Sequence, residues 1–162
     1  MPQIILYAIT GFILFEFVLT KLLSYLNLKT WNKPLPAEVK DLYDAKKYAE
    51  AKDYALANYK VGIITSVLML IITVAFLWMK GFARVDEIAR SYSSSPVIQS
   101  LIFFAIIGAA SSAIGLPFEL YDTFVIEEKF GFNKTTAKTF VLDKLKGLAL
   151  AVVVGAGMLA LL

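Results

Sequence analysis

The chain has 162 residues, of which 59% are hydrophobic and 18% are charged, with a net charge of +3 and a mean hydropathy of +0.70. This composition is too apolar for an ordinary soluble domain, whose surface must be hydrated, so the sequence predicts an integral membrane protein. Because the chain has no cysteine and no histidine, disulfides and thiolate zinc sites are excluded, and most hydrolytic mechanisms lose their central acid–base residue.

The first apolar segment covers residues 4–28, which is long enough to cross a hydrocarbon core of about 30 Å at about 1.5 Å per residue. Two ionisable residues interrupt it. Lys21 can extend toward the headgroups, whereas Glu16 lies near the midplane. We expect Glu16 to face the interior of the helix assembly or a cavity, because a carboxyl group facing lipid is costly. The alternative is a protonated carboxyl group that is hydrogen-bonded to a neighbouring helix and has no chemical role.

A charged segment connects this first span to the second. Residues 28–36 predict a turn, with Trp31 as an interfacial anchor. Pro36 suits the first turn of a helix, because its missing N–H would have no partner there, and residues 37–60 have a charged, helical pattern. We therefore expect a solvated helix that continues into the membrane.

The next two spans are separated by a short connection. Residues 61–79 carry no charge and include Trp78 near their end, in the manner of an interfacial belt. Residues 80–96 predict a polar connection with one helical turn around residues 85–89 and a stop at the serines that precede Pro96. Residues 97–116 form the third predicted span.

Residues 116–143 are charged and aromatic, and they organise the end of the third span. Pro117 lacks an N–H and crowds the preceding turn, so the helix must bend or end there, and a bend is favoured. We expect the helix to continue to about Glu128 and to break at Gly131. Asn133 is well placed to cap a new helix by accepting from the N–H of Thr135 or Thr136.

The fourth predicted span begins near Leu145 and faces the third through small residues. Small side chains four residues apart let a neighbouring backbone approach, so a close contact between the third and fourth spans is expected. The small residues are Ala105, Gly108, Ala109, Ser112 and Ala113 in the third span, and Gly147, Ala151 and Gly155 in the fourth. The fourth span ends without a polar or aromatic flank, which is typical of a chain truncated at or within that helix.

These elements predict an all-α polytopic membrane protein with four transmembrane helices plus a charged helix before the second span. Residues 1–162 would form a single membrane-embedded domain. The first and third connections carry seven and five lysines, whereas the second carries only Lys80, Arg84 and Arg90. Because basic residues stay on the cytoplasmic side, we expect the amino terminus outside and the first and third connections in the cytoplasm. This topology also accounts for the positive net charge, so no nucleic-acid partner is predicted.

Three runs carry a resemblance to a known family. They are LPFELYDTFVIEEKFGFNKTT (residues 116–136), FVLDKLKG (residues 140–147) and KPLPAEVKDLYDAKKYAEAKDY (residues 33–54). Together they resemble the N-terminal membrane region of the CAAX prenyl endopeptidases, integral-membrane zinc metalloproteases of the bacterial inner membrane, the endoplasmic reticulum and the inner nuclear membrane. The resemblance implies helices that form part of the wall of a water-filled chamber, next to a catalytic domain that cleaves peptides, prenylated peptides or membrane-protein segments.

The chain departs from the complete family because no H-E-x-x-H sequence is present, so no catalytic or metal residue can be carried over. Zinc is expected only in the complete enzyme, and this chain by itself should bind no cofactor. The expected partners are the lipid bilayer, the catalytic domain and its substrate. The candidate chamber or domain-contact residues are Glu16, Glu119, Tyr121, Asp122, Glu127, Glu128 and Asn133, followed by Thr65, Thr73, Ser111 and Ser112.

The sequence also suggests two other functions. A different class of prenyl-protein protease uses an E-E-x-x-x-R motif, which Glu127 and Glu128 begin, but Phe132 occupies the arginine position and the required histidine is missing. A stand-alone scaffold or regulatory subunit without protease activity is the alternative from another class. The reading frame after Leu162 would distinguish the two: further spans with an H-E-x-x-H helix favour the protease, and a stop codon favours the scaffold.

Overall fold

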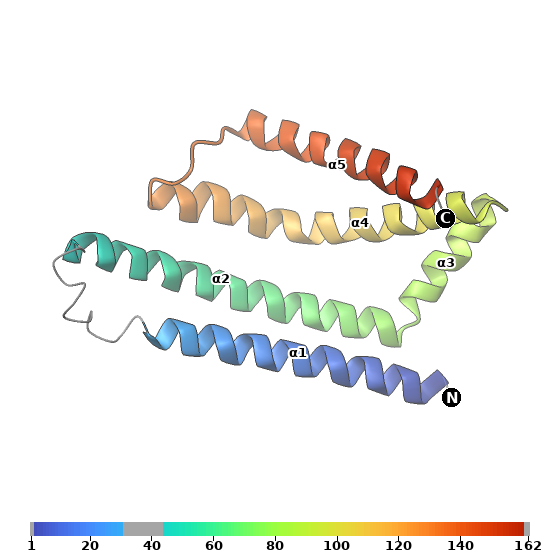
Figure 1. Ribbon diagram of the computed structural model, residues 1–162, viewed down its shortest axis with the longest axis horizontal. Helices are drawn as coiled ribbons and strands as arrows, with labels where there is room; N and C mark the ends of the chain where they lie inside the picture. The colour runs from blue at the N-terminus through green and yellow to red at the C-terminus, as the bar shows by residue number, and fades with distance from the viewer. Residues whose placement is uncertain (1, 31–43, 161–162) are drawn as a thin grey trace.

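The structure is a computed structural model that describes residues 2–30 and 44–160. Every regular element in these two ranges is helical. The elements are α1 (Pro2–Thr30), α2 (Ala45–Trp78), α3 (Gly81–Tyr92), α4 (Pro96–Tyr121), the π-helical segment η2 (Asp122–Glu127) and α5 (Ala137–Ala160). The four long helices run alongside one another, and the short α3 connects α2 to α4 at one end of the molecule (Figure 1). The predicted all-α class is confirmed.

The first two long helices, α1 and α2, pack side by side, and their ends are joined by aromatic and polar contacts. The rings of Tyr7 and Trp78 meet edge to face, with their centroids 5.7 Å apart. The indole N–H of Trp78 donates to the hydroxyl of Thr10 at 3.1 Å. The indole N–H of Trp78 is therefore satisfied by α1 while the residue is 47% exposed, an arrangement that suits a membrane interface.

Helix α2 is one continuous helix of 34 residues, so the charged segment and the second predicted span form a single rod. At about 1.5 Å per residue the rod is about 50 Å long, well beyond a hydrocarbon core of about 30 Å. Its amino end is capped by Asp44, whose carboxylate accepts from the N–H of Lys46 at 2.9 Å. The predicted turn with Trp31 and the helix start at Pro36 lie outside the described residues.

The second connection contains more helix than the sequence predicted. Instead of one turn, α3 has twelve residues, because Gly81, Val85 and Ala89 recur every four residues and are buried against α2 and α4. Lys80, which precedes the helix, has a left-handed backbone with φ of 57°. A Cβ on Gly81 would lie 2.4 Å from the ring of Phe76, so only glycine fits this close approach.

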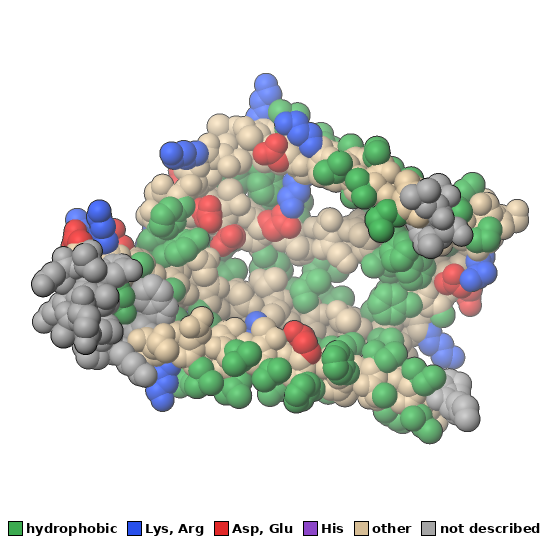
Figure 2. Space-filling view, in the orientation of Figure 1, with side chains coloured by type: hydrophobic (Ala, Val, Ile, Leu, Met, Phe, Trp, Pro, Cys, Tyr) green, Lys and Arg blue, Asp and Glu red, His purple; other side chains and the backbone are tan. Residues whose placement is uncertain are grey.

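Most of the apolar surface faces outward. Val85, Ala89 and Ile126 are the buried hydrophobic residues of the described ranges. Large exposed hydrophobic side chains cover the flanks of the long helices (Figure 2). Three helical stretches are long and apolar enough to cross a membrane: Gln3–Thr30, Lys46–Trp78 and Pro96–Glu127. These three correspond to the first three predicted spans, and α5 falls outside this set.

Candidate functional site

The candidate site is built on residues 116–143, which we call the ledge. Pro117 lies inside α4 without ending it, and the helix continues through η2 as far as Lys129. The predicted continuation past Pro117 to about Glu128 is therefore confirmed. The π-helical turn was not predicted. Such a turn inserts an extra residue into a helix, so it shifts the direction in which the following side chains point.

This helix ends before Gly131. Gly131 has φ of +76°, a left-handed backbone that glycine adopts without strain, which confirms the predicted break. The carbonyl of Glu127 then accepts from the N–H of Phe132 at 2.8 Å and of Asn133 at 3.1 Å. These bonds satisfy backbone groups that the end of a helix would otherwise leave unpaired.

Tyr54 of α2 contacts the ledge and holds it against α2. Its ring meets Phe130 and Phe132 edge to face, with centroids 5.3 and 4.9 Å apart. Its hydroxyl donates to the carboxylate of Glu127 at 3.2 Å. The ledge is therefore an ordered structure docked on α2, as the sequence predicted for a segment too charged to be a simple turn.

Asn133 makes the predicted bond to the N–H of Thr135, but α5 begins only at Ala137, so Asn133 does not cap that helix as expected. Its side-chain oxygen accepts from the N–H of Thr135 at 2.6 Å, and its side-chain nitrogen donates to Glu128 at 3.2 Å, so it orders the connection. Helix α5 begins at Ala137, and the hydroxyl of Thr136 accepts from the N–H of Thr139 at 3.2 Å. Thr136 is thus the cap, because its hydroxyl is in reach of the third helical residue.

Between α4 and α5 lies a groove of about 1210 Å³, which we call the α4–α5 groove. The small residues predicted to bring the two helices together line its walls instead, with the exception of Ala113. A Cβ on Gly108, Gly147 or Gly155 would meet no atom within 4 Å, so the predicted close contact is absent at these positions. Small residues permit a close approach but do not enforce it. Figure 2 shows the opening between the two helices.

Bulky and charged side chains at the ledge end hold α4 and α5 together. Lys144 of α5 forms an ion pair with Glu119 of α4 and lies 5.6 Å from the ring centroid of Phe140. Phe140 in turn meets Phe124 edge to face at 5.7 Å. The polar end of the groove is lined by Glu119, Asp122, Thr123, Glu127, Thr135, Asp143 and Lys144. The groove therefore has an apolar body and a polar end located at the ledge.

The predicted site residues do not all lie at one site. Glu119, Asp122 and Glu127 line the α4–α5 groove together. Tyr121 lines a different, smaller cavity on the α2 side. Glu128 bonds Asn133 at the tip of the ledge.

Glu16 lies on α1, is exposed, and accepts from the hydroxyl of Thr20 at 2.9 Å. Ser112 lines the α4–α5 groove, whereas the hydroxyl of Thr65 donates to the carbonyl of Val61 within its own helix. Tyr54 and Lys144 were missed by the sequence prediction. Thr123 was also missed, although it lies four residues after Glu119 and four before Glu127, a spacing that places it on the same helix face.

The residues of the ledge do not make a zinc site. In residues 2–30 and 44–160, no three carboxylates come together in a group that could hold a metal ion. Glu119 is paired with Lys144, and Glu127 accepts from Tyr54. The sequence contains neither histidine nor cysteine to complete a ligand set.

Fold and surface define the class as a multi-helix membrane domain with a folded polar ledge at one end. A model of the family described as the CAAX prenyl protease N-terminal region, with five membrane helices, matches residues 24–162. The chain therefore belongs to the CAAX prenyl protease N-terminal family, and the resemblance seen in the sequence is confirmed.

Several known proteins are similar to the chain. The probable CAAX prenyl protease 1 of Schizosaccharomyces pombe is 38% identical over 138 residues, which cover 74% of this chain and 29% of the relative. The CAAX prenyl protease 1 of Saccharomyces cerevisiae is 30% identical over 164 residues, which cover 94% of this chain and 36% of the relative. The crystal structure of S. mikatae Ste24p matches with a TM-score of 0.86 and 30% identity, covering 96% of this chain and 38% of that protein. The chain thus spans about a third of the length of these relatives.

Proposed function

We propose that this chain forms the non-catalytic N-terminal membrane part of a CAAX-type zinc metalloendopeptidase, where its helices form part of a chamber wall. The observation that carries the proposal is the match to Ste24p, which extends over 96% of this chain with a TM-score of 0.86. The chain's own chemistry agrees, because it offers no histidine or cysteine, and two ledge carboxylates, Glu119 and Glu127, are engaged by Lys144 and Tyr54. Zinc and the groups that activate water would belong to a catalytic part outside these residues.

The same proposal makes α5 a fourth membrane span. It has 24 residues, which at about 1.5 Å per residue gives about 36 Å, enough to cross a hydrocarbon core of about 30 Å. Its charged residues are confined to its first turns, up to Lys146, and the following residues are apolar and largely exposed.

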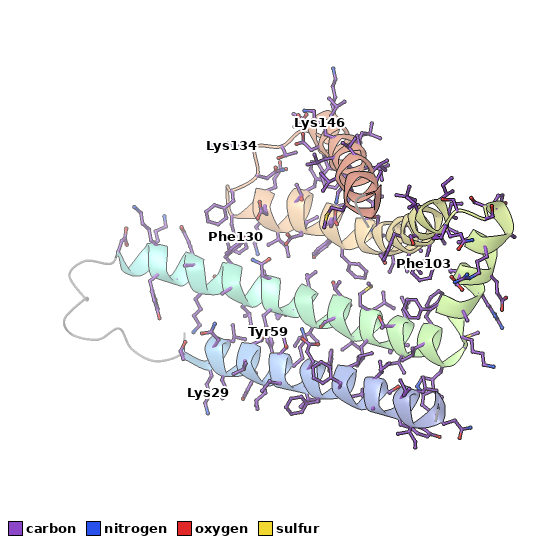
Figure 3. All side chains as sticks on the ribbon, turned by 45° about the vertical axis from the view of Figure 1, so that its right-hand side comes forward. Lys29, Tyr59, Phe103, Phe130, Lys134 and Lys146 are labelled. Atoms are coloured by element: carbon purple, nitrogen blue, oxygen red, sulfur yellow. The ribbon has the colours of Figure 1, made fainter. Side chains whose placement is uncertain are left out.

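The proposed orientation places the ledge in the cytoplasm and the amino terminus outside. Figure 3 shows Lys29 and Lys134 on the side of the molecule that is remote from α3. The end of α1, the beginning of α2 and the ledge lie at one end of the molecule (Figure 1), and the positive-inside rule, applied to the lysine-rich sequence of the first and third connections, assigns that end to the cytoplasm. The compartment would be a bacterial inner membrane, the endoplasmic reticulum or the inner nuclear membrane.

In this proposal the ledge is the surface that meets the catalytic domain or lines the chamber mouth. Glu119, Asp122 and Glu127 support this role, because a polar end on an otherwise apolar groove provides hydrated acceptors where a peptide or prenylated-peptide substrate would pass. Glu16 is the candidate chamber residue on α1, on the ground that a carboxyl group at midplane depth requires a polar or protein environment.

A cleavage assay on the full-length protease tests the proposed role of the ledge. The triple variant carries Glu119→Ala, Asp122→Ala and Glu127→Ala, and the control variant carries Arg84→Ala, Glu87→Ala and Ser94→Ala in the connection on the opposite side. At equal protein abundance, the ledge variant should lose about tenfold or more in kcat/KM, as expected when residues that position a substrate are removed. Equal, small effects of both variants would contradict the proposed ledge function.

A further inference from the structure

A second cavity, of about 420 Å³, lies between α2 and η2 and is distinct from the α4–α5 groove. We call it the α2–η2 groove. It is lined by Asp53, Leu56, Ala57, Lys60, Val61, Tyr121, Val125, Ile126, Lys129 and Phe130. The lining combines an apolar wall with two lysines and the phenol of Tyr121, so it is suited to an amphiphilic ligand.

Within residues 2–30 and 44–160, neither lysine of this groove forms an ion pair with a carboxylate. The ion pairs of the described ranges are Asp86 with Arg90, Glu119 with Lys144, and Asp143 with Lys146. Lys60 has no ion-pair partner among these residues, and Lys129 lies 5.2 Å from the ring centroid of Phe130. Both lysines are exposed and line the same groove, and each ammonium group carries three hydrogen-bond donors.

The lysines also lie at one membrane boundary. Lys60 comes directly before the uncharged run of residues 61–79, and Lys129, which lines the same groove, lies just beyond the end of the helix Pro96–Glu127 that contains the third span. Helices α2 and α4 run in opposite directions, so the beginning of the uncharged run of α2 lies beside η2, which follows α4 (Figures 1 and 3). The apolar wall, with Val61 and Val125, therefore lies beside the lysines where the hydrocarbon core starts.

We propose that the α2–η2 groove binds an anionic phospholipid, with its phosphate between Lys60 and Lys129 and its glycerol and upper acyl carbons against Val61 and Val125. Charge complementarity favours this ligand, because basic pockets between membrane helices are suited to anionic headgroups. Free phosphate would use the same lysines and leave the apolar wall uncovered. Asp53 lies seven residues before Lys60, about 10 Å farther from the membrane along α2, so it is directed at the outer part of a headgroup.

Native mass spectrometry of the full chain tests this site without reference to protease activity. The purified protein is incubated in detergent with phosphatidylserine or phosphatidylcholine of identical acyl chains, and retained lipid is counted. The double variant Lys60→Gln and Lys129→Gln should retain about thirtyfold less phosphatidylserine, which is the expected effect of removing two lysines from a headgroup. The matched control is Lys134→Gln with Lys138→Gln, which removes the same charge from exposed positions near the same end.

The control should change phosphatidylserine retention by less than about twofold, because its lysines line neither groove. Equal loss in both variants would mean diffuse attraction to anionic lipid and would overturn the proposal. Equal retention of phosphatidylserine and phosphatidylcholine by the unmodified protein would also overturn it. Displacement of phosphatidylserine by inorganic phosphate at millimolar concentration would assign the lysines to a soluble anion instead. Circular dichroism of both variants verifies that the helices are retained.

Discussion

Glu119 of α4 and Lys144 of α5 form an ion pair across the polar end of the α4–α5 groove, 25 residues apart in the chain. The small residues farther along both helices leave open space between them. The pair therefore acts with the Phe124–Phe140 contact to set the separation of the two helices at the ledge.

We expect Lys144→Glu to widen the distance distribution between spin labels placed at Ser112 and Ala151, because two carboxylates then face each other across the groove. The side chains are 49% and 45% exposed, so the effect on the free energy of unfolding should be below about 1 kcal/mol. Adding Glu119→Lys should restore the original distribution. Lys146→Glu, whose lysine pairs with Asp143 inside α5, is the control and should leave the distances unchanged. No change in the single variant would show that the pair does not hold the helices.

Tyr54→Phe should loosen the ledge by removing the hydrogen bond to Glu127 while keeping both ring contacts. The expected cost is about 1 kcal/mol, seen as about fivefold faster hydrogen exchange at the amides of Phe132 and Asn133. Tyr59→Phe is the matched control, because the Tyr59 hydroxyl has no hydrogen-bond partner in the described ranges. Equal exchange rates in the two variants would contradict a role for the Tyr54 hydroxyl.

In the turn before α3, substitutions at the adjacent residues Lys80 and Gly81 should have opposite effects on stability. Gly81→Ala should destabilise the fold by about 1–3 kcal/mol, because its Cβ would displace the Phe76 ring, which meets Phe82 at 4.9 Å. Lys80→Gly should be neutral or stabilise by up to about 1 kcal/mol, since glycine adopts the left-handed backbone without strain. Gly62→Ala, whose Cβ would meet nothing within 4 Å, should not destabilise. Thermal unfolding in detergent measures all three, and a neutral Gly81→Ala would disprove the steric account.

Single cysteines should report the proposed orientation, because the chain has no cysteine of its own. A cysteine at Ser94 should react with an impermeant maleimide from outside the cell, and one at Ala45 only from the cytoplasmic side. Labelling of both positions from one side would mean that α2 does not cross the membrane as proposed.

Features of the fold that depend on local sequence could be predicted. Long apolar runs marked the three stretches that can span a membrane, and Gly131 marked the break after the third, because glycine is the residue that takes a left-handed backbone freely. The full length of α3 was missed, although Gly81, Val85 and Ala89 have helical spacing, because serines and charges dominate the composition around them.

Contacts between distant elements could not be predicted from one sequence. Nothing near Lys144 identifies Glu119 as its partner, and nothing near Tyr54 indicates Phe130, because these pairings depend on how the helices are placed side by side. The choice between Asn133 and Thr136 as the helix cap was equally open, since both residue types accept from backbone N–H groups. The small residues of α4 and α5 indicated a tight interface, but Gly108, Gly147 and Gly155 face open space, and the ring contact and the ion pair between the two segments are at the ledge end.

The π-helical segment η2 sets the direction in which the side chains after it point. Deleting one residue from Asp122–Glu127 would turn this segment into regular α-helix, and the downstream chain would rotate by about 100° about the helix axis. Phe130 would then point away from Tyr54, and the entry angle of α5 would change with it. A single residue of chain length in η2 therefore determines which faces of the last two helices meet.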